Sequence, residues 1–442
     1  MVPSTVMRAT ALALGLALAA GCTHANDPPV KSVAIATPRE LVAIADDFPA
    51  ALAKAKAEGK PLFVDVWAPW CHTCLSLRAY VLSDPAFVGR FGDKFVFATI
   101  DTEKDQNQAF VASHPVEAWP TLLVVDPRSD AVVLRWLGAA TLEELSVLLD
   151  DAAAVYAGKG SAAASAALAT SSKLLAEGKR SEARKVLEDA LDKAGPRRPA
   201  LVDQLVSVLH KDDPPACVAV AGRELATLPF GTSRANVAIA GLACATSTKA
   251  DPAPFVTALH AMADGKGALL ADDRSCVFEA LVEHYEKLEK KDDLKKTATA
   301  WAAFLEAEAG KAKDPAGRTV FDWHRMEAYL ALGEPARAVP MLEASEKDFP
   351  TDYNPPARLA KIQLVMGKAD LAKATVGRAL ARAYGPRRLR ILALAADIAK
   401  ARGDLAGEKS ALDDAIALGD ATKPTGGYAK LLEQLRARRA KL

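Results

Sequence analysis

The feature that most constrains this chain is a pair of cysteines, two residues apart, between an apolar run and a helix-like segment. Residues 62–67 are typical of a buried β-strand, and Cys71 and Cys74 stand where a helix is predicted to begin. The free N–H groups and the positive dipole end of a helix N-terminus stabilise a thiolate. A thiolate beside a second thiol can attack a disulfide, so the pattern predicts a site for disulfide exchange.

The segments around this motif predict an α/β domain over residues 38–157. The strand-like runs are 62–67, 95–100, 121–125 and 132–137, and the helix-like runs are 38–58, 71–83, 105–113 and 142–156. Strands joined by helices and followed by a terminal hairpin are typical of an α/β sandwich, with parallel strands first.

The composition changes after about residue 158. The rest of the chain is rich in Ala, Leu, Lys and Glu, which favour helices. Gly333, Gly367 and Gly403 follow helix-like segments at intervals of 34 and 36 residues, and an isolated similar unit lies at Gly178. The spacing resembles tetratricopeptide repeats, whose period is about 34 residues. We predict an all-α helical-repeat domain over 158–442, tetratricopeptide-like especially over 320–442, with another array of helical hairpins as the alternative.

The first 21 residues resemble the signal of a bacterial lipoprotein. Arg8 precedes an apolar run, 9–20, that is too short to span a bilayer and ends just before Cys22. The resemblance implies that Cys22 is lipidated, that residues 22–37 form a tether, and that the protein is anchored to a membrane in the periplasm. Thr23 favours the outer membrane. The alternative is an ordinary secretory peptide in which Cys22 is incidental.

The strand 62–67 and the Trp70-Cys-x-x-Cys that follows it resemble the thioredoxin superfamily, and above all the C-terminal thioredoxin-like domains of membrane thiol:disulfide interchange proteins. The resemblance implies that Cys71, the more exposed of the pair, is the nucleophile and that Cys74 resolves the mixed disulfide. It also implies that Asp65 is a buried acid that transfers protons, although a structural polar group is the alternative. Pro120 is implied to be a cis proline that docks the substrate backbone.

Four further residues are expected to tune this site: Trp70, His72, Thr73 and Trp119. A protonated His72 beside the nucleophile favours the thiolate and makes the pair more oxidising. A solvated His72 with little effect is the alternative. His72-Thr73 stands where thioredoxin has Gly-Pro, and Leu75 where it has Lys, so the redox potential and the electron donor stay open.

Half of a zinc site is the competing interpretation of the cysteine pair. A structural zinc ion takes four ligands, commonly from two close pairs. The other cysteines are single and distant, and the seven histidines form no paired spacing, so we predict no metal and no cofactor. In an oxidising compartment, Cys217, Cys244 and Cys276 allow one bridge and one spare thiol. The pairing stays open, and three buried helical cysteines are the alternative.

These patterns predict an exported, membrane-tethered thiol–disulfide oxidoreductase. Its expected partners are proteins with disulfides or thiols, a membrane electron donor, and proteins that dock on the helical repeats. The 56 Lys plus Arg nearly balance the 55 Asp plus Glu, which argues against a nucleic-acid partner. The alternative is a scaffold or adaptor lipoprotein whose thioredoxin-like domain is not redox-active. The direction of electron flow is not set by the sequence.

Overall fold

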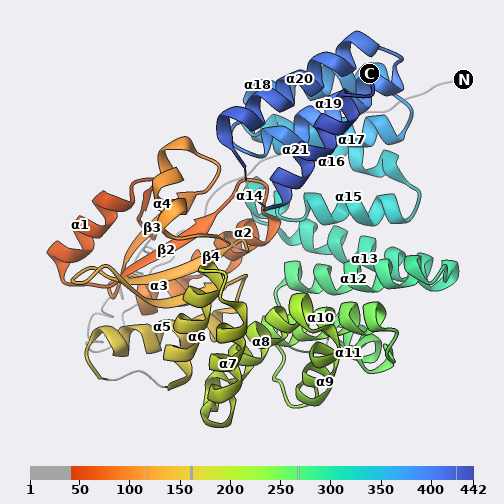
Figure 1. Ribbon diagram of the computed structural model, residues 1–442. Coiled ribbons are helices and arrows are strands. Elements are labelled where there is room, and N and C mark those ends of the chain that lie inside the picture. Colours follow the sequence, from red (N-terminus) through yellow and green to blue (C-terminus); the bar gives the residue numbers. More distant parts are fainter. Residues whose placement is uncertain (1–40, 117, 160–162, 266, 268, 425) are drawn as a thin grey trace, which may run out of the picture. The chain divides into compact units, whose positions relative to one another are not determined.

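The structure is a computed structural model that describes residues 41–442 except 117, 160–162, 266, 268 and 425 (Figure 1). The predicted signal peptide, Cys22 and the tether lie outside the described residues. All described residues belong to one compact unit. No helix in this part of the chain combines the length and the apolar character that a membrane crossing needs.

The α/β part contains a five-stranded sheet with the order β1-β3-β2-β4-β5. The strands are β1 (Ala43–Ala45), β2 (Leu62–Trp67), β3 (Val96–Asp101), β4 (Thr121–Asp126) and β5 (Ala131–Leu137). β1, β3 and β2 are parallel, whereas β4 is antiparallel to both β2 and β5. The central strand β2 is buried along almost its whole length, as expected for a strand that is covered on both faces. The predicted parallel strands and terminal hairpin are confirmed.

The prediction of one helix over 38–58 is wrong in its first half. Residues 43–45 form strand β1, which pairs with β3 through Ala43 and Phe97, and the helix begins only after Asp47. Asp47 caps that helix by accepting the N–H of Ala50 at 2.9 Å. The helices of the α/β part are α1 (Phe48–Glu58), α2 (His72–Leu77), a π-helical turn (Arg78–Leu82), α3 (Pro85–Phe91), α4 (Gln108–Ser113) and α5 (Leu142–Tyr156).

After α5 every described regular element is helical, as the composition predicts. The helices are α6 (Ala163–Ala176), α7 (Arg180–Ala190), α8 (Arg198–Asp212), α9 (Pro214–Glu224), α10 (Thr232–Thr248), α11 (Ala253–Ala263), α12 (Ala271–Lys287), α13 (Lys291–Lys311), α14 (Pro315–Thr319), α15 (Asp322–Ala331), α16 (Ala338–Asp348), α17 (Asn354–Val365), α18 (Ala369–Arg382), α19 (Arg388–Ala401), α20 (Leu405–Thr422) and α21 (Gly426–Arg439). We refer to α6–α21 as the helical array.

The predicted repeat glycines end helices in the array. Gly333, Gly367 and Gly403 follow α15, α17 and α19 with φ angles of +72°, +73° and +69°, and Gly178 follows α6 with a φ of +75°. Glycine adopts this left-handed conformation without the steric penalty of a side chain. The turns therefore fold neighbouring helices back on each other. The small residues that pack between them are fully buried, namely Ala338, Ala372, Ala379 and Ala415.

The helical array packs against the α/β part at several points. Helix α6 contacts strand β5, and α12 and α14 both contact α2, the helix that begins at the cysteine pair. Glu144 of α5 caps its own helix and also accepts the N–H groups of Thr232 (3.2 Å) and Ser233 (3.1 Å) at the start of α10. The array therefore reaches the predicted redox site directly.

One disulfide joins two helices of the array. Cys217 in α9 and Cys244 in α10 are bonded, both are fully buried, and Cys276 in α12 is a free thiol. This settles the pairing that the sequence leaves open, in favour of one bridge and one spare thiol.

Asp203 in α8 makes the stability of the protein depend on pH. Burial raises the pKa of this carboxyl to about 8, although Asn236 donates to it at 3.0 Å. The folded state thus keeps a proton that the unfolded state releases above its pKa of 3.8, so stability falls as pH rises from about 4 to 8. We expect Asp203→Asn to remove up to about 1.4 kcal/mol per pH unit of this slope.

Urea unfolding of both proteins at pH 5 and pH 8 measures the difference. The wild type should lose more stability than Asp203→Asn between the two pH values. Asp212→Asn, at the exposed end of the same helix, serves as the control and should follow the wild type. Parallel curves for the wild type and Asp203→Asn would show that Asp203 is ionised in the folded protein.

Candidate redox site

The two cysteines lie together at the N-terminus of α2, directly after strand β2 and its turn. Their sulfurs are 2.12 Å apart and form a disulfide. Cys71 is the N-cap residue of α2, and its Sγ accepts the N–H of Cys74 at 3.0 Å. Cys71 is 5% exposed and Cys74 is 0% exposed, so Cys71 is the more accessible residue, although both are buried.

Aromatic side chains surround the disulfide. Trp70 and Trp119 pack against the two cysteines, and their rings lie 5.1 Å apart. The Trp119–Pro120 peptide bond is cis, as the family resemblance implies, and Pro120 is buried. Trp119 donates its indole N–H to the Thr102 hydroxyl at 2.9 Å, which fixes the ring beside the site. The structure thus places Trp70 and Trp119 against the cysteine pair, and the cis bond follows directly after Trp119.

Asp65 lies within β2, is 1% exposed, and has one partner that the sequence did not indicate. Arg78 Nε donates to Asp65 Oδ2 at 2.7 Å, and the Arg78 guanidinium lies 3.5 Å from the centre of the Trp67 ring. Burial raises the pKa of Asp65, and the charge and hydrogen bond of Arg78 only partly oppose this. Asp65 Oδ1 is buried without a hydrogen-bond partner among the described residues. It is the oxygen on which this carboxyl can hold a proton.

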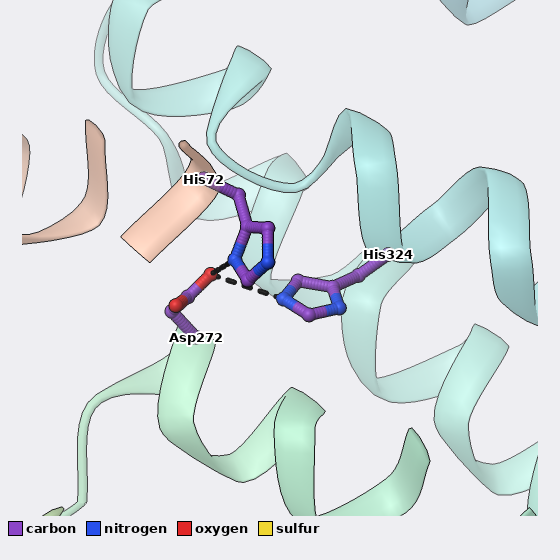
Figure 2. Close-up of side chains that lie close together, drawn as sticks. All are labelled: His72, Asp272 and His324. Atoms are coloured by element: carbon purple, nitrogen blue, oxygen red, sulfur yellow. Dashed lines mark hydrogen bonds and ion pairs between the residues drawn. The ribbon is translucent and has the colours of Figure 1, made fainter. Parts of the chain in front are cut away.

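His72, in the spacer between the cysteines, contacts the helical array (Figure 2). Its Nδ1 lies 2.9 Å from Asp272 Oδ1 in α12, and the same oxygen lies 3.1 Å from His324 Nε2 in α15. Asp272 and His324 are fully buried, whereas the His72 side chain is 23% exposed. Thr73 Oγ1 lies 3.2 Å from His72 Nδ1. His72 is therefore held by an acid 200 residues away rather than freely solvated.

The pKa values of the three side chains depend on one another. Burial alone lowers the pKa of His72, but Asp272 and, to a smaller extent, Glu279 raise it above the ordinary value. Burial raises the pKa of Asp272, but the two histidines outweigh burial and hold it below its usual range. Burial and the nearby His72 charge lower the pKa of His324 to about 4. These shifts favour the charged forms of His72 and Asp272 and the neutral form of His324.

Residues of the same cluster are also the candidates for holding a metal ion. Within the described part of the chain, His72, Asp272 and His324 form the group whose ligand-type atoms all lie within 4.8 Å of one another. Histidine nitrogens with one carboxylate oxygen suit zinc. In the structure, however, Asp272 Oδ1 already accepts hydrogen bonds from both imidazoles. Asp272 Oδ2 and His324 Nδ1, in contrast, are buried without a hydrogen-bond partner among the described residues.

The array also holds the turn before Cys71. Asn354 Nδ2 donates to the carbonyl oxygen of Pro69 at 3.1 Å. Trp70 Nε1 donates to Glu103 Oε1 at 2.8 Å, and the backbone N–H of Arg387 donates to Glu103 Oε2 at 2.7 Å. The sequence alone does not indicate Asn354, Glu103 and Arg387 as partners of this turn, because they lie far from the motif along the chain.

The backbone of the array also comes close to the backbone of Glu103. Gly385 has a φ of +62°, and a Cβ at this position would lie 2.2 Å from the carbonyl oxygen of Glu103. Only glycine fits there without a shift of the backbone. Tyr384 next to it donates its hydroxyl to Asp101 Oδ2 at 2.6 Å. The loop before α19 is therefore fitted closely to the end of β3.

The sheet topology and the cysteine pair at the start of α2 define a thioredoxin fold with a Cys-x-x-Cys disulfide. A family model described as Thioredoxin-like matches residues 43–127. A thioredoxin from Mycolicibacterium smegmatis is 37% identical over 91 residues, which are 20% of this chain and 77% of that protein. The chain therefore belongs to the thioredoxin-like family through this domain.

Longer relatives share only part of their length with the chain. The thiol:disulfide interchange protein DsbD of Salmonella paratyphi A is 31% identical over 105 residues, which are 23% of this chain and 18% of that protein. DsbD of Pseudoalteromonas atlantica is 34% identical over 89 residues, which are 20% of this chain and 15% of that protein. The matched stretch thus spans less than a fifth of these interchange proteins. A solved tetratricopeptide repeat protein from Parabacteroides merdae is 12% identical with a TM-score of 0.40, over 62% of this chain and 99% of that chain.

Proposed function

We propose that this protein is an exported, membrane-tethered thiol–disulfide oxidoreductase that acts on protein substrates. The observation that carries the proposal is the Cys71–Cys74 disulfide at the N-terminus of α2, beside Trp70 and the cis bond before Pro120. The likeness to a thioredoxin and to interchange proteins supports the same chemistry. Cys71 is the proposed nucleophile because it caps the helix and is the more exposed residue of the pair.

The proposed exchange moves two electrons in the reducing direction. The Cys71 thiolate attacks a substrate disulfide, a Cys71–substrate bond forms, and the leaving substrate sulfur takes a proton. Cys74 gives its proton to Asp65 and attacks Cys71 Sγ, which forms the Cys71–Cys74 bond and breaks the Cys71–substrate bond. The second substrate sulfur leaves as a thiolate and takes a proton from water. The protein is left as the disulfide, and an external dithiol must reduce it again. Run backwards, the same steps oxidise a substrate dithiol.

The other parts of the chain have supporting roles in this proposal. Residues 1–21 direct export. Lipidated Cys22 and the tether 22–37 anchor the chain to a membrane facing the periplasm, with the outer membrane favoured. The redox site is carried by residues 38–157. The array, 158–442, recruits and orients partners, because stacked helical hairpins present extended binding surfaces. A membrane electron donor supplies the reducing equivalents. The exported setting is supported by the likeness to interchange proteins.

The burial of the cysteines favours a second candidate function. Cys71 is only 5% exposed, and contacts from the array hold both the turn before it, through Asn354, and the residue after it, through Asp272. In this second candidate the protein is an anchored scaffold, and the Cys71–Cys74 disulfide is a structural clip.

An insulin-reduction assay separates the two candidates. With dithiothreitol as the reductant, the wild type should accelerate the precipitation of insulin chains, and Cys71→Ser should fall to the uncatalysed rate because no mixed disulfide can form. Cys276→Ser is the matched control, since it removes the free thiol outside the site and should retain the wild-type rate. A wild type no faster than the uncatalysed reaction would favour the scaffold.

A further inference from the structure

A cationic cavity lies on the helical array beside the redox turn. It has a volume of about 210 Å³ and is lined by residues of α15, of α17 and of α19 together with the residues just before α17 and α19. Four lining side chains are basic, and none of the lining residues is acidic: the basic ones are Arg358, Lys361, Arg387 and Arg390. We refer to this hollow as the basic cavity.

Arg358 is the most buried of these basic side chains. It is 9% exposed, and among the described residues no carboxylate oxygen lies within 4 Å of its guanidinium. Burial lowers its pKa, while Asp322 and Asp352 act on it only at longer range. A buried cation without a hydrogen-bonded anion is unfavourable. An anionic ligand in the cavity would supply the missing partner.

The neighbouring cations leave the cavity positive. Lys361 pairs with Glu327 at 2.8 Å, and its ammonium lies 5.3 Å from the centre of the Trp323 ring. Within the described part of the chain, the guanidinium groups of Arg387 and Arg390 have no carboxylate within 4 Å. They lie instead over aromatic rings, 4.9 Å from the centre of Trp70 and 5.5 Å from the centre of Tyr428. Planar guanidinium groups bind carboxylates through paired hydrogen bonds.

The basic cavity is joined to the redox turn by two of its own lining residues. Asn354 holds the carbonyl of Pro69, and Arg387 lies over the ring of Trp70, the residue before Cys71. A group bound between these arginines would therefore lie beside the peptide that leads into the nucleophile. The volume suits one or two side chains and is too small for a folded domain.

We infer that the basic cavity binds a carboxylate of the substrate, so that peptides with acidic residues near the reacting disulfide or thiol are preferred. The substrate class rests on the proposed function, whereas the binding of an acidic peptide does not. Trp323, Ala357 and Leu394 belong to the apolar part of the lining and would contact the methylene groups of a glutamate. Arg358, Arg387 and Arg390 would hold its carboxylate.

A peptide titration tests the binding without any redox step. Acetyl-Ala-Glu-Glu-Ala-amide and its Gln-Gln twin are titrated into the full-length protein, and tryptophan fluorescence reports occupancy because Trp323 lines the cavity. The acidic peptide should bind at least about ten-fold more tightly than the twin. Arg358→Met and Arg390→Gln should each remove this preference. Lys400→Gln, an exposed change on α19 outside the cavity, should keep it.

The outcomes separate this inference from the proposed function. Equal affinity for the two peptides, or a preference that survives both arginine variants, would overturn the basic cavity as a carboxylate site. Arg390 is exposed, so its variant remains informative even if Arg358→Met fails to fold. Binding of inorganic phosphate without binding of the acidic peptide would also overturn the carboxylate assignment. Acidic-peptide binding in a protein that does not reduce insulin would support the cavity and reject the oxidoreductase.

A turnover assay then tests the substrate class. Two disulfide-bonded peptides that differ only in Glu or Gln beside one cysteine are reduced by the wild type. The Glu peptide should have the lower KM, and the difference should disappear in Arg390→Gln. Equal KM values in the wild type would show that the cavity, even if it binds acids, does not select substrates.

Discussion

Replacing Asp272 with Ala is expected to lower the free energy of unfolding by about 3–5 kcal/mol. Asp272 is fully buried, and a single oxygen accepts hydrogen bonds from both His72 and His324. Its removal leaves the buried N–H of His324 without an acceptor, takes the nearer acceptor from His72 Nδ1, and removes the partner of the His72 charge. The loss should lie near the lower end of this range, because His72 can release its proton once the carboxylate is gone.

Urea unfolding followed by circular dichroism measures this loss. Asp370→Ala in α18 is the matched control, since that side chain is 89% exposed and its ion pair with Arg402 lies at the surface. A surface pair of this kind contributes between 0 and about 1 kcal/mol. Asp272→Asn keeps one acceptor oxygen and should fall between the two. An Asp272→Ala protein as stable as the control would mean that the cluster does not stabilise the contact between α2 and the array.

The same cluster shows where prediction from the sequence stops. The strand 62–67, the helix start at Cys71 and the turn glycines are set by neighbouring residues, so local patterns predict them. The cis bond before Pro120 follows from the family resemblance. Asp272, in contrast, is separated from His72 by 200 residues and lies in a helix whose local pattern shows nothing unusual. Only the packing of α12 against α2 brings the two side chains together.

Strand β1 illustrates the opposite error. Leu41, Ile44 and Ala45 suggest a helical face, but Ala43–Ala45 forms the edge of the sheet. Short apolar runs suit either structure, and pairing with β3 decides the outcome. Arg78 was missed for a related reason. Arg78 is close to Cys74 in the sequence. Its hydrogen bond to Asp65, however, depends on how α2 and the π-helical turn after it pack on β2.

Removal of the bridge in the array is expected to have the second large effect on stability. Replacing both Cys217 and Cys244 with Ala should lower the free energy of unfolding by about 3–4 kcal/mol. The two residues are 27 positions apart, and a crosslink across such a loop restricts the unfolded chain. Both side chains are fully buried, so the Ala pair also loses some packing between α9 and α10.

The measurement compares two proteins that both lack the Cys71–Cys74 disulfide. Urea unfolding is compared between Cys71→Ser/Cys74→Ser and the same protein with Cys217→Ala/Cys244→Ala added, so that the bridge between α9 and α10 is the one disulfide that differs. Adding Cys276→Ala instead is the control and should change stability far less, because that thiol is unbonded. Reductant should destabilise the first protein and leave the bridge-free protein unchanged. A loss below about 1 kcal/mol would mean that the unfolded chain is already compact around α9 and α10, so that the crosslink restricts little.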